Sequence, residues 1–140
     1  MKERPMQTAK AQFALKTWDE RPYLELEDGA KMTNSTITYT YSGDIEGESQ
    51  LEYLMYYNPD QSGTVVGLQR VTGALAGKKG SFAIKHVGTF DKIGVKETLE
   101  IVPGSGTDEL VGLRGTGGFD IAGHMDAYPI EFSYEFVDGE

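Results

Sequence analysis

Apolar and polar residues alternate through most of residues 36–57, and this pattern constrains the fold more than any other feature of the chain. A two-residue period places successive side chains on opposite faces, as in a β-strand with one buried face. In the first half of the segment one face carries Ile37, Tyr39, Tyr41 and Ile45, and the other carries Thr36, Thr38, Thr40, Ser42, Asp44, Glu46 and Glu48. Strands that are apolar on one side and acidic on the other suit a small β-barrel.

Similar segments recur along the chain. Predicted strands cover residues 8–18, 31–43, 45–57, 65–75, 81–90, 95–102 and 128–137, and another begins at residue 117. Short turn segments rich in Gly, Asn, Asp and Pro separate most of them. Seven or eight strands with short connections indicate an antiparallel meander, and closure into a barrel removes its exposed edges. We therefore predict an all-β fold, a closed antiparallel up-and-down β-barrel with one short helical turn that starts at Thr107.

Two strand boundaries depend on single residues. Pro22 is expected to end the first strand and to leave residues 23–31 as a loop over the barrel mouth, because proline fixes φ and restricts the residue before it. Alternation persists across Gly43, which favours one bent continuous strand over a turn at Gly43 and Asp44. In the first strand, one face carries Ala9, Ala11, Phe13 and Leu15.

The length of 140 residues predicts a single domain over residues 1–140, with residues 1–7 as a loose N-terminal end. The first ten residues carry charge without a following apolar run, which indicates neither a signal peptide nor a membrane span. We therefore expect a cytoplasmic protein without a membrane partner. The net charge of −9, from 13 basic and 22 acidic side chains, also disfavours nucleic acid as a partner.

His86 is the most interesting single residue. It shares a strand face with Phe82, Ile84 and Phe90, and this face should point into the barrel. A buried imidazole needs hydrogen-bond partners and changes its charge near neutral pH. His86 is therefore either a satisfied core histidine or a catalytic or ligand-binding residue.

Charged residues on the strands leave alternatives open. Arg70 shares a face with Val66 and Leu68. If that face points inward, Arg70 needs a carboxylate from Glu46, Glu48 or Glu52, or it binds a ligand carboxylate; otherwise it faces water. The acids Asp44, Glu46 and Glu48 form a solvated face or supply a general base, and we select Glu48 with His86 as catalytic candidates.

Aromatic residues on the predicted strands belong to the core or, if the barrel keeps a cavity, line that cavity and orient a ligand. The ligand-binding candidates are Trp18, Tyr39, Tyr41, Tyr53, Tyr57, Arg70 and His86. We expect no metal and no cofactor. The chain has no Cys and only two His, residues 73–79 lack the P-loop spacing, and residues 115–118 lack the context of a dinucleotide loop.

Several sequence blocks resemble one known family. They are residues 16–20, 22–23, 39–48, 52–55, 67–73, 80–82, 86–90, 102–107 and 112–115, with the sequences KTWDE, PY, YTYSGDIEGE, EYLM, GLQRVTG, GSF, HVGTF, VPGSGT and GLRG. In this order, over about residues 8–136, they resemble the bacterial domain-of-unknown-function family 3224 (DUF3224). The resemblance implies an eight-stranded barrel of the allene oxide cyclase type with a mouth at one end, and a homo-oligomer. It implies no reaction and no catalytic residues.

Three hypotheses follow for function. The first is a barrel that binds a small, largely apolar or carboxylate-bearing molecule in its cavity, and a barrel packed solid by its own side chains would contradict it. The second is a cofactor-independent isomerase, cyclase or lyase that acts by proton transfer, which requires His86 and an acid to converge on one void. The third is a structural or oligomerisation module without a ligand.

Overall fold

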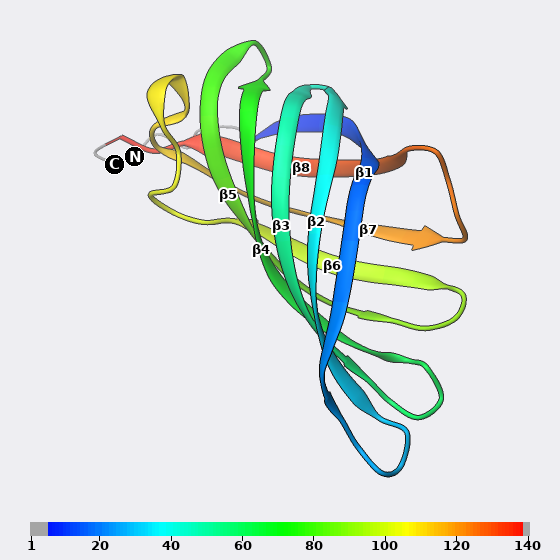
Figure 1. Cartoon of the computed structure of the whole chain (residues 1–140). Coiled ribbons are helices and arrows are strands. Elements are labelled where there is room, and N and C mark those ends of the chain that lie inside the picture. The colour runs from blue at the N-terminus through cyan, green and yellow to red at the C-terminus, as the bar shows by residue number, and fades with distance from the viewer. Residues whose placement is uncertain (1–5, 139–140) are drawn as a thin grey trace.

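Eight antiparallel strands close into one barrel, in which each strand pairs with the next and β8 pairs with β1 (Figure 1). The structure is a computed structural model that describes residues 6–138. The strands are β1 (Gln7–Glu25), β2 (Lys31–Gly43), β3 (Ile45–Tyr57), β4 (Gly63–Leu75), β5 (Lys78–Phe90), β6 (Gly94–Ile101), β7 (Leu113–Ala122) and β8 (Tyr128–Phe136), with a 3₁₀ turn, η1 (Asp108–Leu110), before β7. The predicted fold class is confirmed.

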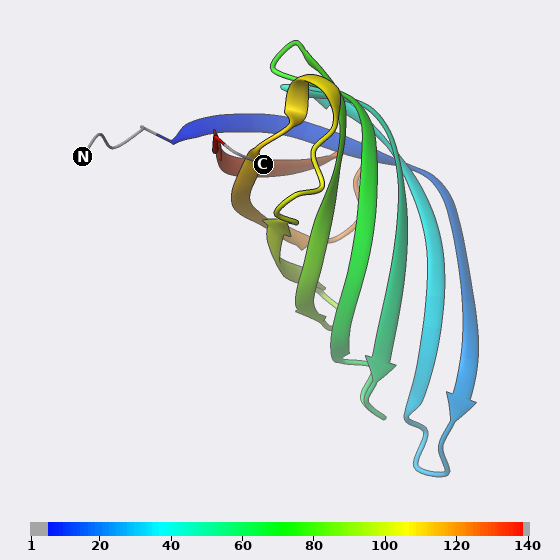
Figure 2. The same ribbon diagram turned by 90° about the vertical axis from the view of Figure 1, so that its left-hand side faces the viewer.

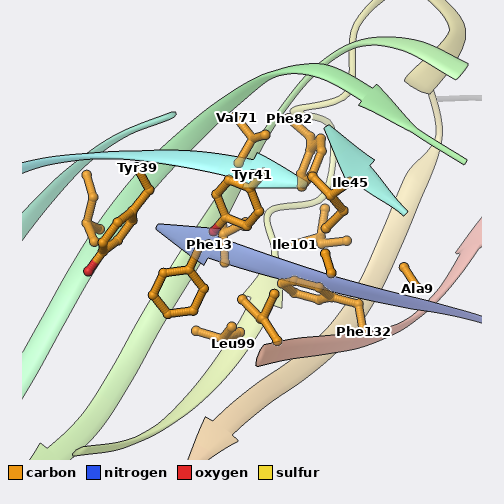
Figure 3. Close-up of a cluster of buried hydrophobic side chains, with 14 of the residues drawn as sticks. Ala9, Phe13, Tyr39, Tyr41, Ile45, Val71, Phe82, Leu99, Ile101 and Phe132 are labelled. Atoms are coloured by element: carbon orange, nitrogen blue, oxygen red, sulfur yellow. The ribbon is translucent and has the colours of Figure 1, made fainter. Parts of the chain in front are cut away.

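Alternation along each strand produces the core, because every second side chain points to the barrel axis. On β2, Ile37, Tyr39 and Tyr41 are buried. Phe82 and Ile84 on β5 and Phe132 on β8 belong to the same buried cluster. Figure 3 shows Phe82 and Phe132 among its labelled members, between the strands. The expectation that Phe82, Ile84 and His86 point inward is confirmed, since each is at most 2% exposed.

The first strand departs from the prediction at Pro22. β1 continues to Glu25, with a register shift between Pro22 and Leu24, so the expected end of the strand is wrong. The reason is that β8 pairs with β1 only from Gln7 to Phe13. Beyond Phe13, β1 pairs with β2 alone among the described residues, and an edge strand tolerates a proline without an N–H. Figure 2 shows β1 bending away from β8 at this point.

A second register shift lies between Leu15 and Thr17 and makes Lys16 a bulge residue. Because a bulge reverses the alternation, Trp18 lies opposite the inward-facing Ile37. Leu15 shares the inward face of β1 with Ala9, Ala11 and Phe13, as expected, and it lies opposite Tyr39 in the cavity lining. It is 45% exposed because it follows the point where β1 leaves β8.

The expected continuous strand through Gly43 is also wrong. β2 ends at Gly43 and β3 begins at Ile45, with Tyr41 opposite Gly47, so the chain turns back as a tight hairpin. Gly43 has a φ of +98°, a conformation that favours glycine. The Asp44 carboxylate holds the turn by accepting a hydrogen bond from the Lys10 N–H at 2.8 Å.

The two ends of the barrel differ. At one end lie η1 and the β2–β3 and β4–β5 turns (Figure 1). Leu110 of η1 is fully buried. Thr107 precedes η1 but makes no side-chain cap hydrogen bond. The loops 26–30, 58–62, 91–93 and 123–127 surround the other end, which we call the mouth. Gln7 begins β1, and residues 1–5 of the expected loose end lie outside the described residues. Among residues 6–138, no helix has the length and apolar character needed to cross a membrane.

Candidate functional site

The mouth of the barrel contains a cavity of about 390 Å³ to which all eight strands contribute. This volume lies within the usual range for small-molecule sites. Its lining is mostly aromatic and aliphatic: Phe13, Leu15, Trp18, Tyr39, Tyr53, Met55, Tyr57, Val65, Phe90, Asp91, Gly94, Val95, Glu97, Phe119, Ile121, Gly123, His124 and Tyr128. A wider hollow of about 660 Å³ lies elsewhere, beside Lys10, Gln12 and Glu131, and these three side chains are exposed.

Glu97 is the one lining residue whose carboxylate is almost completely buried. It is 4% exposed, and it lies on β6 in alternation with the core residues Leu99 and Ile101. The Tyr53 hydroxyl donates to Glu97 Oε2 at 2.6 Å, and His86 Nδ1 lies 2.7 Å from Glu97 Oε1. A buried carboxylate is costly unless such partners satisfy it.

Behind Glu97 the hydrogen bonds continue through the barrel. His86 Nε2 lies 2.8 Å from Gln69 Oε1, and Gln69 Nε2 donates to Ser49 Oγ at 2.7 Å and to Tyr41 Oη at 3.0 Å. Every buried side-chain nitrogen and oxygen among the described residues has a partner.

These hydrogen bonds determine how many protons the His86–Glu97 pair must carry. An amide oxygen only accepts, so the bond to Gln69 Oε1 requires a proton on His86 Nε2. The contact between His86 Nδ1 and Glu97 Oε1 then requires one further proton, carried by either atom. The pair therefore holds a transferable proton at the base of the cavity.

Two glycines make room for these side chains. Gly67 of β4 pairs with Tyr53 on one side and His86 on the other, and a Cβ at Gly67 would lie 2.6 Å from Tyr53 Cδ1. The rings of Tyr53 and His86 instead meet edge-on with centroids 5.6 Å apart. Gly88 pairs with Glu97, and a Cβ there would lie 2.6 Å from Glu97 Cγ.

Aromatic rings form the walls above Glu97. Trp18 meets Tyr53 edge-on with centroids 6.4 Å apart, and Tyr57 meets Phe90 at 4.9 Å. The ring centroids of Tyr39 and Phe13 are 4.7 Å apart. Figure 3 shows the two rings side by side. Tyr39 belongs to the cavity lining. A ligand can therefore bind it.

The tyrosine hydroxyls stay protonated at neutral pH. Burial raises the pKa of Tyr53 well above its usual 10.0, and the nearby Glu97 carboxylate raises that pKa further. Burial is also the largest cause of the raised pKa values of Tyr39, Tyr41 and Tyr57. These residues act as neutral donors and acceptors in and beneath the cavity.

At the rim, Glu20 holds two wall residues in place. Its carboxylate accepts hydrogen bonds from Trp18 Nε1 at 3.2 Å, Tyr57 Oη at 2.5 Å and Thr33 Oγ1 at 2.7 Å. Glu20 reaches these groups because the bulge at Lys16 reverses the alternation of β1.

Comparison with known proteins places the chain in a family. A family model described as "Protein of unknown function (DUF3224)" matches residues 9–134. The chain belongs to the DUF3224 family. A DUF3224 protein of unknown function from Shewanella oneidensis MR-1 has a similar crystal structure, with 29% sequence identity and a TM-score of 0.80. The match covers 96% of this chain and 99% of the Shewanella chain. No curated protein matches the chain significantly.

In the present DUF3224 protein, four of the ligand-binding candidates selected from its sequence line the cavity, namely Trp18, Tyr39, Tyr53 and Tyr57. His86 lies directly behind Glu97, and Tyr41 lies deeper, against Gln69.

Arg70 and Glu48 lie on the outer surface. Gln69 and Val71 of β4 point inward, so Arg70 between them points outward and donates to Ser81 Oγ at 2.9 Å. Glu48 accepts from Thr40 Oγ1 at 3.1 Å and lies 3.5 Å from Lys16 Nζ. Neither side chain lines the cavity, so of the alternatives left open for Arg70 the structure shows the one in which it faces water and not a clamp for a ligand carboxylate in the cavity.

Sequence reasoning missed Glu97, Gln69 and Glu20. The signal for Glu97 was available, because it alternates with Leu99 and Ile101 as an acid on an apolar strand face. Gln69 likewise alternates with Val65 and Val71. No such signal existed for Glu20, since its inward position depends on the bulge. Among the described residues, no group of three or more His, Cys, Asp or Glu side chains could hold a metal ion.

Proposed function

We propose that this protein binds a small, largely apolar molecule in the cavity at the barrel mouth. The observation that carries this proposal is the cavity of about 390 Å³ with aromatic walls and one buried polar cluster, Tyr53–Glu97–His86, at its base. Binding sites usually combine a mostly apolar lining with a few polar groups that orient the ligand. A barrel packed solid throughout would not offer this space.

The test is titration with N-phenyl-1-naphthylamine, a neutral apolar dye whose fluorescence rises on transfer from water to an apolar site. Trp18 is the only tryptophan of the chain and lines the cavity, so its emission reports the same event. Val95→Phe fills the cavity, whereas Val66→Phe makes the same change on the outer face, where Val66 is 42% exposed.

We expect saturable dye binding to the wild type and to Val66→Phe, and at least about tenfold weaker binding to Val95→Phe. Equal dye binding by all three proteins would place the dye elsewhere and contradict the proposal.

A second candidate function is proton transfer without a cofactor. It is favoured by Glu97, which faces the cavity and shares a proton with His86. Glu97 would take a proton from a carbon next to a ligand carbonyl and return it, while the Tyr39 hydroxyl donates to the developing oxyanion. Incubation of 4-phenylbutan-2-one in D₂O tests this by NMR. Deuterium exchange next to the carbonyl should be faster with wild type than with Glu97→Gln, and equal rates would exclude Glu97 as the base.

The homo-oligomer stays a prediction. Sedimentation velocity at micromolar concentration measures it directly, and a monomer would count against the third hypothesis, a structural or oligomerisation module.

A further inference from the structure

Acidic side chains outnumber basic side chains in the lining of the cavity. The ionisable lining residues besides tyrosine are Glu97 at the base and Asp91 and His124 at the rim. Among the described residues, no lysine or arginine lines the cavity. Lys31 lies at the same end of the barrel, but its Nζ sits 4.8 Å from the Tyr57 ring centroid and is not part of the lining.

The buried pair is oriented with respect to the cavity. Glu97 lines the cavity, whereas His86 does not and contacts Glu97 from behind. Any positive charge on the imidazole is therefore screened from a ligand by the carboxylate in front of it. A ligand carboxylate would meet the acidic end of this pair inside a site of low dielectric, where repulsion between like charges is strong.

Glu97 also retains hydrogen-bonding capacity. When the shared proton is on His86 Nδ1, Glu97 is an ionised carboxylate, which offers about four acceptor sites. Oε2 uses one of them for the Tyr53 hydroxyl and Oε1 uses one for His86. An ammonium group, which has three donors and no acceptor, matches the remaining sites, and the Tyr39 hydroxyl provides a further acceptor nearby in the lining.

The walls favour a cation for an independent reason. The faces of Trp and Tyr rings attract ammonium groups, and desolvated sites strengthen this attraction. Trp18, Tyr39, Tyr53 and Tyr57 all contribute rings to the lining. The same rings cover an apolar body well.

We propose that the ligand of this cavity is an apolar molecule with one cationic amine, bound with its nitrogen against the Glu97 carboxylate. This inference rests on the proposed binding function and adds the chemical class of the ligand. Glu97 serves as the counter-ion, and His86 holds Glu97 in position from behind.

Three probes with one apolar body test it: 4-phenylbutylamine, 4-phenylbutan-1-ol and 4-phenylbutanoate. Their affinities for the full chain are measured by calorimetry and by Trp18 fluorescence, with N-phenyl-1-naphthylamine as the reference ligand. The proteins are wild type, Glu97→Gln and Glu48→Gln. Glu48→Gln is the matched control, because it makes the same change of charge on the outer surface, where Glu48 pairs with Lys16.

We expect the amine to bind the wild type at least about tenfold more tightly than the carboxylate, with the alcohol between them. Glu97→Gln should weaken amine binding by about tenfold and leave alcohol binding within about twofold, and Glu48→Gln should change neither. The wild-type ranking tests the ligand class even if Glu97→Gln does not fold.

Each of the other possible outcomes contradicts a different part of the inference. Carboxylate binding as tight as amine binding, or dye binding without binding of any of the three probes, contradicts the ligand class and leaves the binding function intact. An amine preference that survives in Glu97→Gln, or that Glu48→Gln abolishes equally, contradicts the role of Glu97. Failure of the dye and of all three probes contradicts the proposed function itself.

Discussion

His86 Nδ1 lies 2.7 Å from Glu97 Oε1, and both side chains are only 2% exposed. The two residues are eleven positions apart on neighbouring strands, β5 and β6, and the contact places a shared proton beneath the mouth cavity. The binding proposal, the proton-transfer alternative and the inferred amine ligand all depend on this contact.

Removal of one partner of this pair should destabilise the protein strongly. Glu97→Ala leaves His86 and the Tyr53 hydroxyl without their buried acceptor, and we expect a loss of about 3–5 kcal/mol in the free energy of unfolding. Urea denaturation followed by circular dichroism measures it.

The matched control is Glu100→Ala on the same strand. Glu100 pairs with Lys85 at 3.1 Å on the outer surface, and this exposed pair should contribute at most about 1 kcal/mol. Similar losses for Glu97→Ala and Glu100→Ala would contradict the structural importance of the buried network.

Buried tyrosines should make the fold sensitive to alkali. The pKa values of Tyr39, Tyr41, Tyr53 and Tyr57 are raised above 10.0, mainly by burial. Below pH 10 both states keep these protons, so the tyrosines add no pH dependence. Above pH 10 the unfolded state loses them first and binds fewer protons than the native state, so stability falls as pH rises.

Absorbance at 295 nm measures this ionisation, with the protein in concentrated urea as the reference. We expect part of the tyrosine signal of the native protein to appear only when circular dichroism reports unfolding. Complete tyrosine ionisation in a protein that is still folded would contradict the prediction.

Gly67→Ala should disturb the site from within the sheet. The added Cβ would lie 2.6 Å from both the Glu52 carbonyl oxygen and Tyr53 Cδ1, so the strand or the Tyr53 ring must shift. We expect a destabilisation of about 1–3 kcal/mol together with weaker dye binding.

Gly77→Ala provides the comparison. Gly77 has a φ of +82° in the β4–β5 turn, and an added Cβ there meets no described atom within 4 Å. This variant should lose only about 1 kcal/mol from backbone strain, with dye binding unchanged. Unchanged dye binding by a folded Gly67→Ala would show that Tyr53 does not need its present position.

Ligand binding should depend on the walls of the cavity and not on the outer face. Trp18→Ala removes a wall residue and should weaken dye binding by about tenfold. Arg70→Ala removes an exposed guanidinium that contacts Ser81, and dye binding should not change. Fluorescence titration compares the two variants, and a larger effect of Arg70→Ala would place the ligand on the outer surface.

The sequence by itself determined the barrel and the inward direction of most core side chains. Alternation is a local property, because the extended backbone sends successive side chains to opposite faces whatever the strand pairs with. For this reason Tyr39 and His86 were placed correctly on inward faces, and the turn residues indicated a meander. The same alternation also marks Glu97 as an acid on an inward face.

Only the tertiary structure decided which of these side chains meet. The register between strands places Gly67 between Tyr53 and His86, and it is set by hydrogen bonds between distant segments. The bulge at Lys16 brings Trp18 and Glu20 to the mouth. β1 pairs with β8 only as far as Phe13, and for this reason Leu15 is exposed and Pro22 lies on an edge strand. Closure of the barrel depends on all eight strands at once, and a local sequence pattern carries no information about the space that this closure leaves unfilled.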